Sequence, residues 1–413
     1  MPAGYIASLP NWDALLEEDY VKKQIVDAIN VSTVFKDELK RVGPTSGRAR
    51  VYTAKVGASQ GTGARREDAQ MPAYGAGEYQ PVRVTARYNY ATFKITGPAE
   101  EFGTHKAFVE FGLQILQDTK EALRLAIGRQ TWGDGQGIMA LINNGGGYAA
   151  GVATTTVDSA YGVLWGSLAA MTTILIKRNM LVQFGTEDNS GQGYRITSVG
   201  TTSITFSPPL QNAIADNATI IILGSSGAEV VGALAMVATA SFMTSVLSLP
   251  NGIYNGIDRV LFPEFEGNVV NANAALSLPL IRATRDAIYK RTDSEMSDLM
   301  IGSTEMAADY EALLVAAQRF VPPNKLRGGY SVLEHDGLQF IKDSKAPIKA
   351  LFFFDTKKIA WMQTADPHWK QDGSGIMRII PGQDAKEALL LWYANLDCME
   401  PRSQAVLYNI THT

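Results

Sequence analysis

Residues 48–95 read "RARVYTAKVGASQGTGARREDAQMPAYGAGEYQPVRVTARYNYATFKI" and contain two extended runs. The first run covers Arg48 to Val56. The second, residues 80–95, alternates with a period of two residues, so one face carries Val82, Val84, Ala86, Tyr88 and Tyr90. About twenty residues rich in glycine, alanine and glutamine separate the runs. This length predicts a long hairpin whose irregular tip becomes ordered when it lies on another surface.

The same stretch contains the signature of a serine hydrolase. Residues 57–61 match G-x-S-x-G, in which Ser59 would be the nucleophile. Such an elbow needs a helix directly after the turn, whereas "GTGARRED" (61–68) places two more glycines there. The segment also lacks the third glycine of a dinucleotide fingerprint and the Gly-Lys-Ser/Thr of a phosphate loop. We therefore interpret Ser59 as a loop-tip residue, with a hydrolase as the minor alternative.

Charge is distributed unevenly between the hairpin and the residues before it. Between residues 48 and 94 there are eight basic residues against three acidic ones, whereas residues 13–19 carry four acids. A basic hairpin and an acidic arm in one chain suggest complementarity between subunits. The residues that we expect at such contacts are Arg48, Arg50, Lys55, Arg65, Arg66, Glu67, Asp68, Arg83, Arg87, Asp13, Glu17 and Glu18. Charge without any partner and nucleic-acid binding by the hairpin remain alternatives.

The overall composition describes an ordered globular chain with few charges. The 413 residues are 46% hydrophobic and 19% charged, with a formal net charge of −4. This charge provides no global attraction to nucleic acid. The single cysteine, Cys398, excludes an internal disulfide framework and fits a packing role. The four histidines are scattered and no catalytic group is evident, so we expect no enzyme, no cofactor and no metal site.

Periodicity predicts the elements of the remaining chain. Helices are expected at residues 13–41, 98–129, 276–292 and 304–320. Short strands at about ten-residue spacing within residues 148–228 indicate a small antiparallel barrel or sandwich. Residues 297–303 and 404–410 are expected as strands, and residues 337–361 as strands paired through the link "APIK". The uncharged stretch from Val230 to Leu249 is expected to be buried in the interior, with no leader peptide and no membrane contact.

This order of elements resembles the major capsid protein of tailed bacteriophages, the Hong Kong 97-type shell fold. The stretches that carry the resemblance are "STVFKDELKRVGPTSGRARVYT", "ALRLAIGRQTWGDGQG", "SDLMIGSTEMAADYEAL", "GLQFIKDSKAPIKALFFFDTKKIAW" and "EPRSQAVLYNI". The likeness rests on the order and texture of the segments rather than on an invariant motif, and it covers most of the chain outside residues 148–228.

The resemblance implies an α+β fold with a defined set of parts. They are an N-terminal arm (1–46), an extended hairpin loop (47–96), a peripheral domain with a spine helix (97–147), a β-barrel-like insertion domain (148–228), a peripheral/axial connection (229–294), an axial domain (295–390) and C-terminal return strands (391–413). Some relatives join a lysine of this loop to an asparagine of a neighbour. Lys55 lies on the hairpin, but neither a partner asparagine nor an acid catalyst is matched, so no cross-link is inferred from the sequence.

The implied function is a structural one. The chain would assemble into hexamers and pentamers of an icosahedral phage head in the host cytoplasm, enclosing double-stranded DNA without sequence-specific binding and forming part of the virion. Scaffolding, portal and decoration proteins would be its further partners. No charged coiled-coil prefix is present, so any scaffold would be a separate protein. An encapsulin-like compartment shares the implied fold and is the alternative function.

Overall fold

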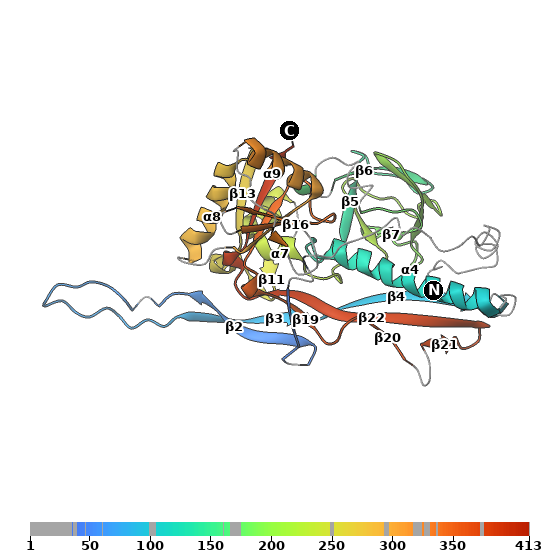
Figure 1. Cartoon of the computed structure of the whole chain (residues 1–413), viewed down its shortest axis with the longest axis horizontal. Helices are drawn as coiled ribbons and strands as arrows, with labels where there is room; N and C mark the ends of the chain where they lie inside the picture. Colours follow the sequence, from blue (N-terminus) through green and yellow to red (C-terminus); the bar gives the residue numbers. More distant parts are fainter. Residues whose placement is uncertain are drawn as a thin grey trace.

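The computed structural model describes residues 35, 39–45, 47–59, 61–98, 105–159, 161–165, 175–247, 252–292, 297–316, 324–325, 331–335, 338–371 and 376–412. The expected hairpin is present. Strands β2 (Ala49–Gly57) and β3 (Glu78–Thr85) pair in antiparallel register and project far to one side of the body (Figure 1). Most of the predicted helix at residues 13–41 lies outside the described residues. The predicted C-terminal end of this helix was wrong, because Lys40–Val42 forms strand β1, which pairs in parallel with β19 (Ile359–Gln363).

The expected second run of the hairpin is two strands rather than one. β3 ends at Thr85 and β4 (Arg87–Thr96) leaves the hairpin to pair along most of its length with β22 (Ala385–Cys398). The side chains that alternate on one face are therefore buried only as far as Ala86, whereas Tyr88 and Tyr90 are exposed. The chain pairs with β2 before Ala86 and with β22 after it, and the buried positions change from the even-numbered to the odd-numbered residues at this switch. The alternation of residue types alone does not reveal such a switch.

β4 and β22 form the long edge of the molecule in Figure 1. They belong to a six-stranded sheet with β1, β19, β20 (His368–Trp369) and β21 (Met377–Ile379). Helix α4 (His105–Gln130) runs along β4 and confirms the long helix expected at residues 98–129. Of its described apolar residues, Leu123 and Ile127 are buried, whereas Ala122 is exposed.

Six strands close into a barrel above the end of α4. They are β5 (Ile138–Ile142), β6 (Thr154–Asp158), β7 (Leu181–Phe184), β8 (Tyr194–Val199), β9 (Ser203–Ser207) and β10 (Thr219–Ile222). Its interior is filled by Phe184, Tyr194 and Phe206, whose ring centroids lie 4.8 to 5.4 Å apart. A short helix, α5 (Gly162–Trp165), follows β6. The barrel thus has an aromatic core, and its first strand precedes residue 148, where the insertion was expected to begin.

A seven-stranded sheet forms the other half of the body. Its order is β13 (Asn268–Ala275), β23 (Ala405–Thr411), β18 (Leu351–Phe354), β14 (Leu299–Gly302), β17 (Leu338–Lys342), β16 (Ser331–His335) and β15 (Asn324–Lys325). Helices α8 (Leu278–Thr292) and α9 (Thr304–Ala316) accompany it. The expected direct pairing within residues 337–361 was wrong, since β17 and β18 lie on opposite sides of the fully buried β14.

The described part of the stretch expected to be buried, residues 230–247, is largely interior. Every residue of α7 (Ala233–Val237) is buried, and the following π-helix (Phe242–Val246) buries Phe242 and Met243. A two-stranded turn, β11 (Ile253–Tyr254) and β12 (Ile257–Asp258), and the 3-10 turn Pro263–Phe265 come next. Among the residues that the structure describes, no helix is both long enough and apolar enough to cross a bilayer.

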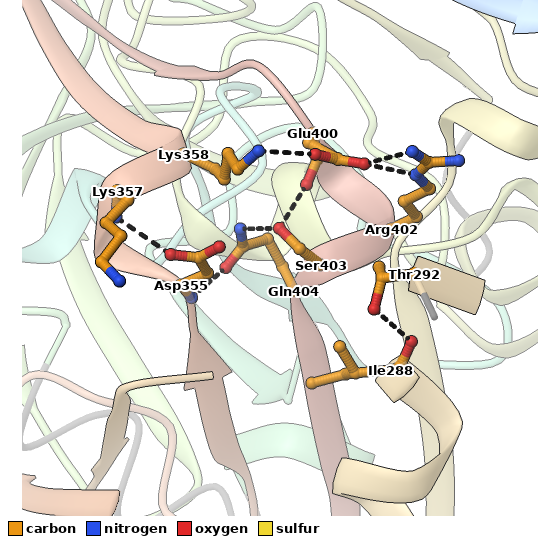
Figure 2. Close-up of polar contacts among 9 residues, drawn as sticks. All are labelled: Ile288, Thr292, Asp355, Lys357, Lys358, Glu400, Arg402, Ser403 and Gln404. Carbon is orange, nitrogen blue, oxygen red and sulfur yellow. Dashed lines mark hydrogen bonds and ion pairs between the residues drawn. The ribbon is translucent and has the colours of Figure 1, made fainter. Parts of the chain in front are cut away.

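Two chain crossings join the two large sheets at one place. The 3-10 turn Thr356–Lys358 connects β18 to β19, and the turn Pro401–Ser403 connects β22 to β23. Figure 2 shows Glu400 between Lys358 and Arg402, with the Lys358 Nζ to Glu400 Oε2 distance 3.0 Å. Gln404 Oε1 accepts a hydrogen bond from the Asp355 backbone amide at 2.9 Å, and Gln404 Nε2 donates one to the Ser403 hydroxyl at 2.7 Å. Burial raises the pKa of Glu400, but the bonds from Lys358 and Arg402 more than offset this and leave the pKa below its ordinary value.

A buried carboxyl in the core makes stability depend on pH. Trp132 stacks on Phe35 and donates its indole Nε1 to Asp343 Oδ2 at 3.2 Å, and the Lys345 amide donates to Oδ1 at 2.8 Å. Burial outweighs these bonds and raises the pKa of Asp343 from 3.8 to about 6. The folded state therefore binds the proton more tightly than the unfolded state does between these values.

The free energy of unfolding should consequently fall by up to about 3 kcal/mol through Asp343 as the pH rises from about 4 to above 6. Urea denaturation at several pH values measures this dependence. The matched variant is Asp343→Asn, which carries no titratable proton and should lose this part of the pH dependence. Equal pH dependence in both proteins would contradict the assignment.

Candidate assembly interface

The base of the hairpin is anchored to the body by apolar packing. Ala54 and Val56 on β2, and Val82 and Val84 on β3, are buried within the main hydrophobic core. The amide of Arg83 also donates to the Asn255 carbonyl at 2.9 Å, which fixes the outer edge of β3 to the β11–β12 turn. An isolated two-stranded hairpin is marginally stable in water, so this packing is what holds the strands in place.

A buried polar cluster reinforces that anchor. Arg50 Nη1 lies 2.6 Å from Asp397 Oδ2, and the Tyr52 hydroxyl lies 2.9 Å from Oδ1. The Asp397 side chain has no exposed surface, and that of Arg50 is 18% exposed. Burial raises the pKa of Asp397, while the contacts with Tyr52 and Arg50 oppose that rise. The cluster thus ties β2 to the end of β22 through a carboxylate that depends on its two partners.

Beyond Gly57 and Glu78 the hairpin leaves the body entirely. Its distal loop (residues 58–77, of which 58–59 and 61–77 are described) points away from the rest of the chain in Figure 1. Met71 is 83% exposed and Tyr74 is fully exposed. The described hydrogen bonds of the loop are internal, such as Ser59 Oγ to the Gly75 carbonyl at 2.8 Å. A side chain at Gly61 would meet the Gly75 amide at 2.9 Å, so this glycine lets the two limbs of the loop approach.

Ser59 has the surroundings of a loop residue. The segment that follows it, residues 61–66, is not helical, and its hydroxyl is engaged by the Gly75 carbonyl. A nucleophile elbow has the opposite arrangement, with a helix after the serine. We expect Ser59→Ala to leave assembly unchanged and wild-type protein to remain unlabelled by a fluorophosphonate probe. Labelling that disappears in Ser59→Ala would contradict this interpretation.

The structure separates the expected contact residues into groups. Arg50 and Arg87 are turned toward the body, where Arg87 Nη1 donates to the Gly227 carbonyl at 2.8 Å. Arg48 and Arg83 are exposed near the base. The exposed residues farther out along the hairpin are Lys55, Arg65, Arg66, Glu67 and Asp68. Asp13, Glu17 and Glu18 lie outside the described residues. The complementarity between the arm and the hairpin stays a prediction.

The sequence analysis did not identify Asp397, the residue that binds Arg50 and Tyr52 at the base of the hairpin. Asp397 interrupts an apolar strand in "LWYANLDC" (391–398), and a lone acid in such a run is a usable signal for a buried partner. The exposure of Met71 and Tyr74 could not be read from residue type, because apolar residues are usually buried. Within the described ranges, no three potential metal ligands among His, Cys, Asp and Glu gather at one place.

Comparison with known proteins shows which solved structures share this architecture. No family model matches the chain, and no curated protein matches it in sequence. A chain of the cyanophage A-1(L) capsid asymmetric unit superposes with a TM-score of 0.58 at 14% identity, covering 97% of this chain and 99% of that one. The chain therefore has the fold of a phage capsid protein, and the resemblance found in the sequence is confirmed at that level.

Two further solved structures align over nearly the full length. The capsid of a native GTA particle gives a TM-score of 0.48 at 9% identity, covering 98% of this chain and 100% of that one. The holo-SrpI encapsulin complex from Synechococcus elongatus gives 0.44 at 9% identity, covering 98% and 96%. The assignment of peripheral, axial and insertion domains stays a prediction, and the boundary expected at residue 390 falls within the continuous strand β22.

Proposed function

We propose that this chain is the major capsid protein of a tailed bacteriophage, assembling into hexamers and pentamers of an icosahedral head that encloses double-stranded DNA. The capsid-protein fold supports a structural role of this kind. It would be assembled in the host cytoplasm and become part of the virion, with separate scaffolding, portal and decoration proteins as candidate partners.

The exposed apolar side chains of the distal loop are the main observation that supports the proposal. A hairpin that is anchored by a buried ion pair at its base, and that exposes Met71 and Tyr74 at its far end, presents apolar surface to solvent instead of burying it. Burial against another copy removes this surface from water. Each such contact is small, but contacts repeated around a closed lattice make subunit exchange slow.

The size of the expressed protein tests the proposal. We expect sedimentation and negative-stain microscopy to show megadalton shells or rings of five and six subunits. Particles that remain at the 44.7 kDa of a single chain under all assembly conditions would contradict the proposal. Shells that package a protein cargo and exclude DNA would instead establish the encapsulin-like alternative.

A further inference from the structure

A cavity of about 630 Å³ lies between the C-terminal part of α4 and the first residues of β4. Residues of the segment 222–229, at the end of barrel strand β10, line it from a third side. The apolar part of the lining includes Leu123 and Ala126 from α4 and Ile222 and Leu223 from the barrel segment. Sites for small organic ligands have volumes of about 300–1,000 Å³, so this cavity has the size of such a site.

Arg87 and Asn89 of β4 contribute unpartnered hydrogen-bond donors to the lining. They are two residues apart on one strand, so both side chains lie on the same face of it. Asn89 is 8% exposed, and its Nδ2 has no acceptor among the described residues. The buried Nε of Arg87 has none either, although Nη1 donates to the Gly227 carbonyl at 2.8 Å. Buried donors without partners are costly, so an acceptor placed in the cavity would stabilise both.

The charges around the cavity are positive on balance. Arg48 is a second cation of the lining and is exposed. The one acid among the described residues of the lining, Glu229, has a side chain that is 5% exposed and forms an ion pair with Arg129. Burial lowers the pKa of Arg87, and no carboxylate opposes this shift. The buried carboxyl of Asp134 lines an adjacent cavity and not this one. Two lining cations thus remain that no lining carboxylate neutralises, which favours an anionic occupant.

A phosphate group matches these donors better than a carboxylate does. A phosphate ester carries a charge of about −1.5 to −2 at neutral pH and three strong acceptor oxygens, one for each of Arg48, Arg87 and Asn89. A carboxylate has a single charge and two oxygens. The phosphate alone occupies a small part of the cavity, which leaves the apolar wall of α4 for an organic group.

We propose that the cavity between α4 and β4 binds the phosphate of an organic phosphate ester, such as a nucleotide. Its oxygens accept hydrogen bonds from Asn89 Nδ2 and Arg87 Nε, and the organic part packs against Leu123 and Ala126. The phosphate comes either from a free nucleotide or from a nucleic-acid strand, which share this chemistry. The site goes beyond the proposed structural function and does not depend on it.

Calorimetric titration of the full-length chain with thymidine monophosphate tests the site. Thymidine, which has the same ring and sugar without the phosphate, should bind at least about tenfold more weakly, because hydrogen bonds to a charged group are lost. Glutamate, a carboxylate, should also bind more weakly than the monophosphate. A thymidine oligonucleotide distinguishes the two sources: tighter binding of the monophosphate indicates a free nucleotide, and tighter binding of the oligonucleotide indicates a nucleic-acid strand.

Variants of the two donors locate the binding. Arg87→Gln removes a cation, and Asn89→Asp replaces the unpaired donor by an anionic acceptor of similar shape, so each should weaken binding of the monophosphate by about tenfold or more. Asn89→Leu removes the donor without adding a charge and serves if Asn89→Asp does not fold. The matched control is Arg83→Gln, which changes the net charge as Arg87→Gln does at an exposed residue outside this lining, and should change the affinity by less than about twofold.

Three results would overturn the site. They are equal losses for Arg83→Gln and Arg87→Gln, equal affinities for thymidine and its monophosphate, and no binding of any phosphate ester to the wild type at millimolar concentrations. None of them bears on the capsid function, since the titration requires folded chains and not shells.

Discussion

Subunits that lack the distal loop should fold normally and fail to assemble. In the variant, residues 58–77 are replaced by Asn-Gly, which joins Gly57 to Glu78 through a two-residue turn suited to paired antiparallel strands. The anchored part of β2 and β3 is retained, so the free energy of unfolding should stay within about 0.5 kcal/mol of the unassembled wild-type subunit. Light scattering and negative-stain microscopy should show single subunits in place of shells.

A control loop of equal length distinguishes the contribution of the loop's side chains to assembly from the contribution of its length. In that control, residues 58–77 keep their number but become a glycine-serine sequence, which preserves reach without apolar or charged groups. We expect it also to fail, because exposed groups such as Met71 and Tyr74 supply the binding energy. Shells formed by the excised chain would mean that the hairpin is dispensable and that another surface drives assembly.

Removing Arg50 should produce the largest loss of subunit stability. Arg50→Ala leaves the Asp397 carboxylate buried with the Tyr52 hydroxyl as its remaining side-chain partner, and breaking such a pair costs about 3–5 kcal/mol. Urea denaturation in the loop-excised background measures folding without interference from assembly. Arg50→Lys, which keeps the charge but loses the guanidinium geometry, should fall between the two proteins.

Arg83→Ala provides the matched comparison, because Arg83 lies on the partner strand of the same hairpin but is exposed. It should change stability by no more than about 0.5 kcal/mol. Similar losses for Arg50→Ala and Arg83→Ala would show that the strands of the hairpin, and not the buried carboxylate, determine the effect.

Local patterns predicted the elements of this chain better than their pairings. The run "SDLMIGS" correctly predicted the buried strand β14, and the periodicity of residues 276–292 predicted α8. Neither pattern could show that β14 would lie between β17 and β18, since strand partners far apart in sequence are chosen by tertiary packing. The break at Ala86, where β3 ends and β4 begins with a different partner strand, was not predicted for the same reason.

The candidate interface was predicted in outline only. Composition indicated that residues 58–77 form an irregular, outward-reaching segment, and the structure places them there. The basic residues of the hairpin looked alike in the sequence, yet Arg50 is sequestered by Asp397 while Arg65 and Arg66 are exposed. The partner that distinguishes them lies 347 positions away in the chain, and nothing local to the hairpin identifies it.

The course of β22 has a mechanical consequence. This strand receives the hairpin at Asp397 and, within a few residues, passes through the turn at Glu400 to Gln404 into β23, which lies between β13 and β18. Tension applied at the distal loop would therefore pass through the Arg50–Asp397 ion pair and then along the short covalent stretch from Asp397 to Ala405 into the opposite sheet. In the proposed shell, a load applied at this loop would be spread across both sheets of the subunit rather than concentrated at the loop.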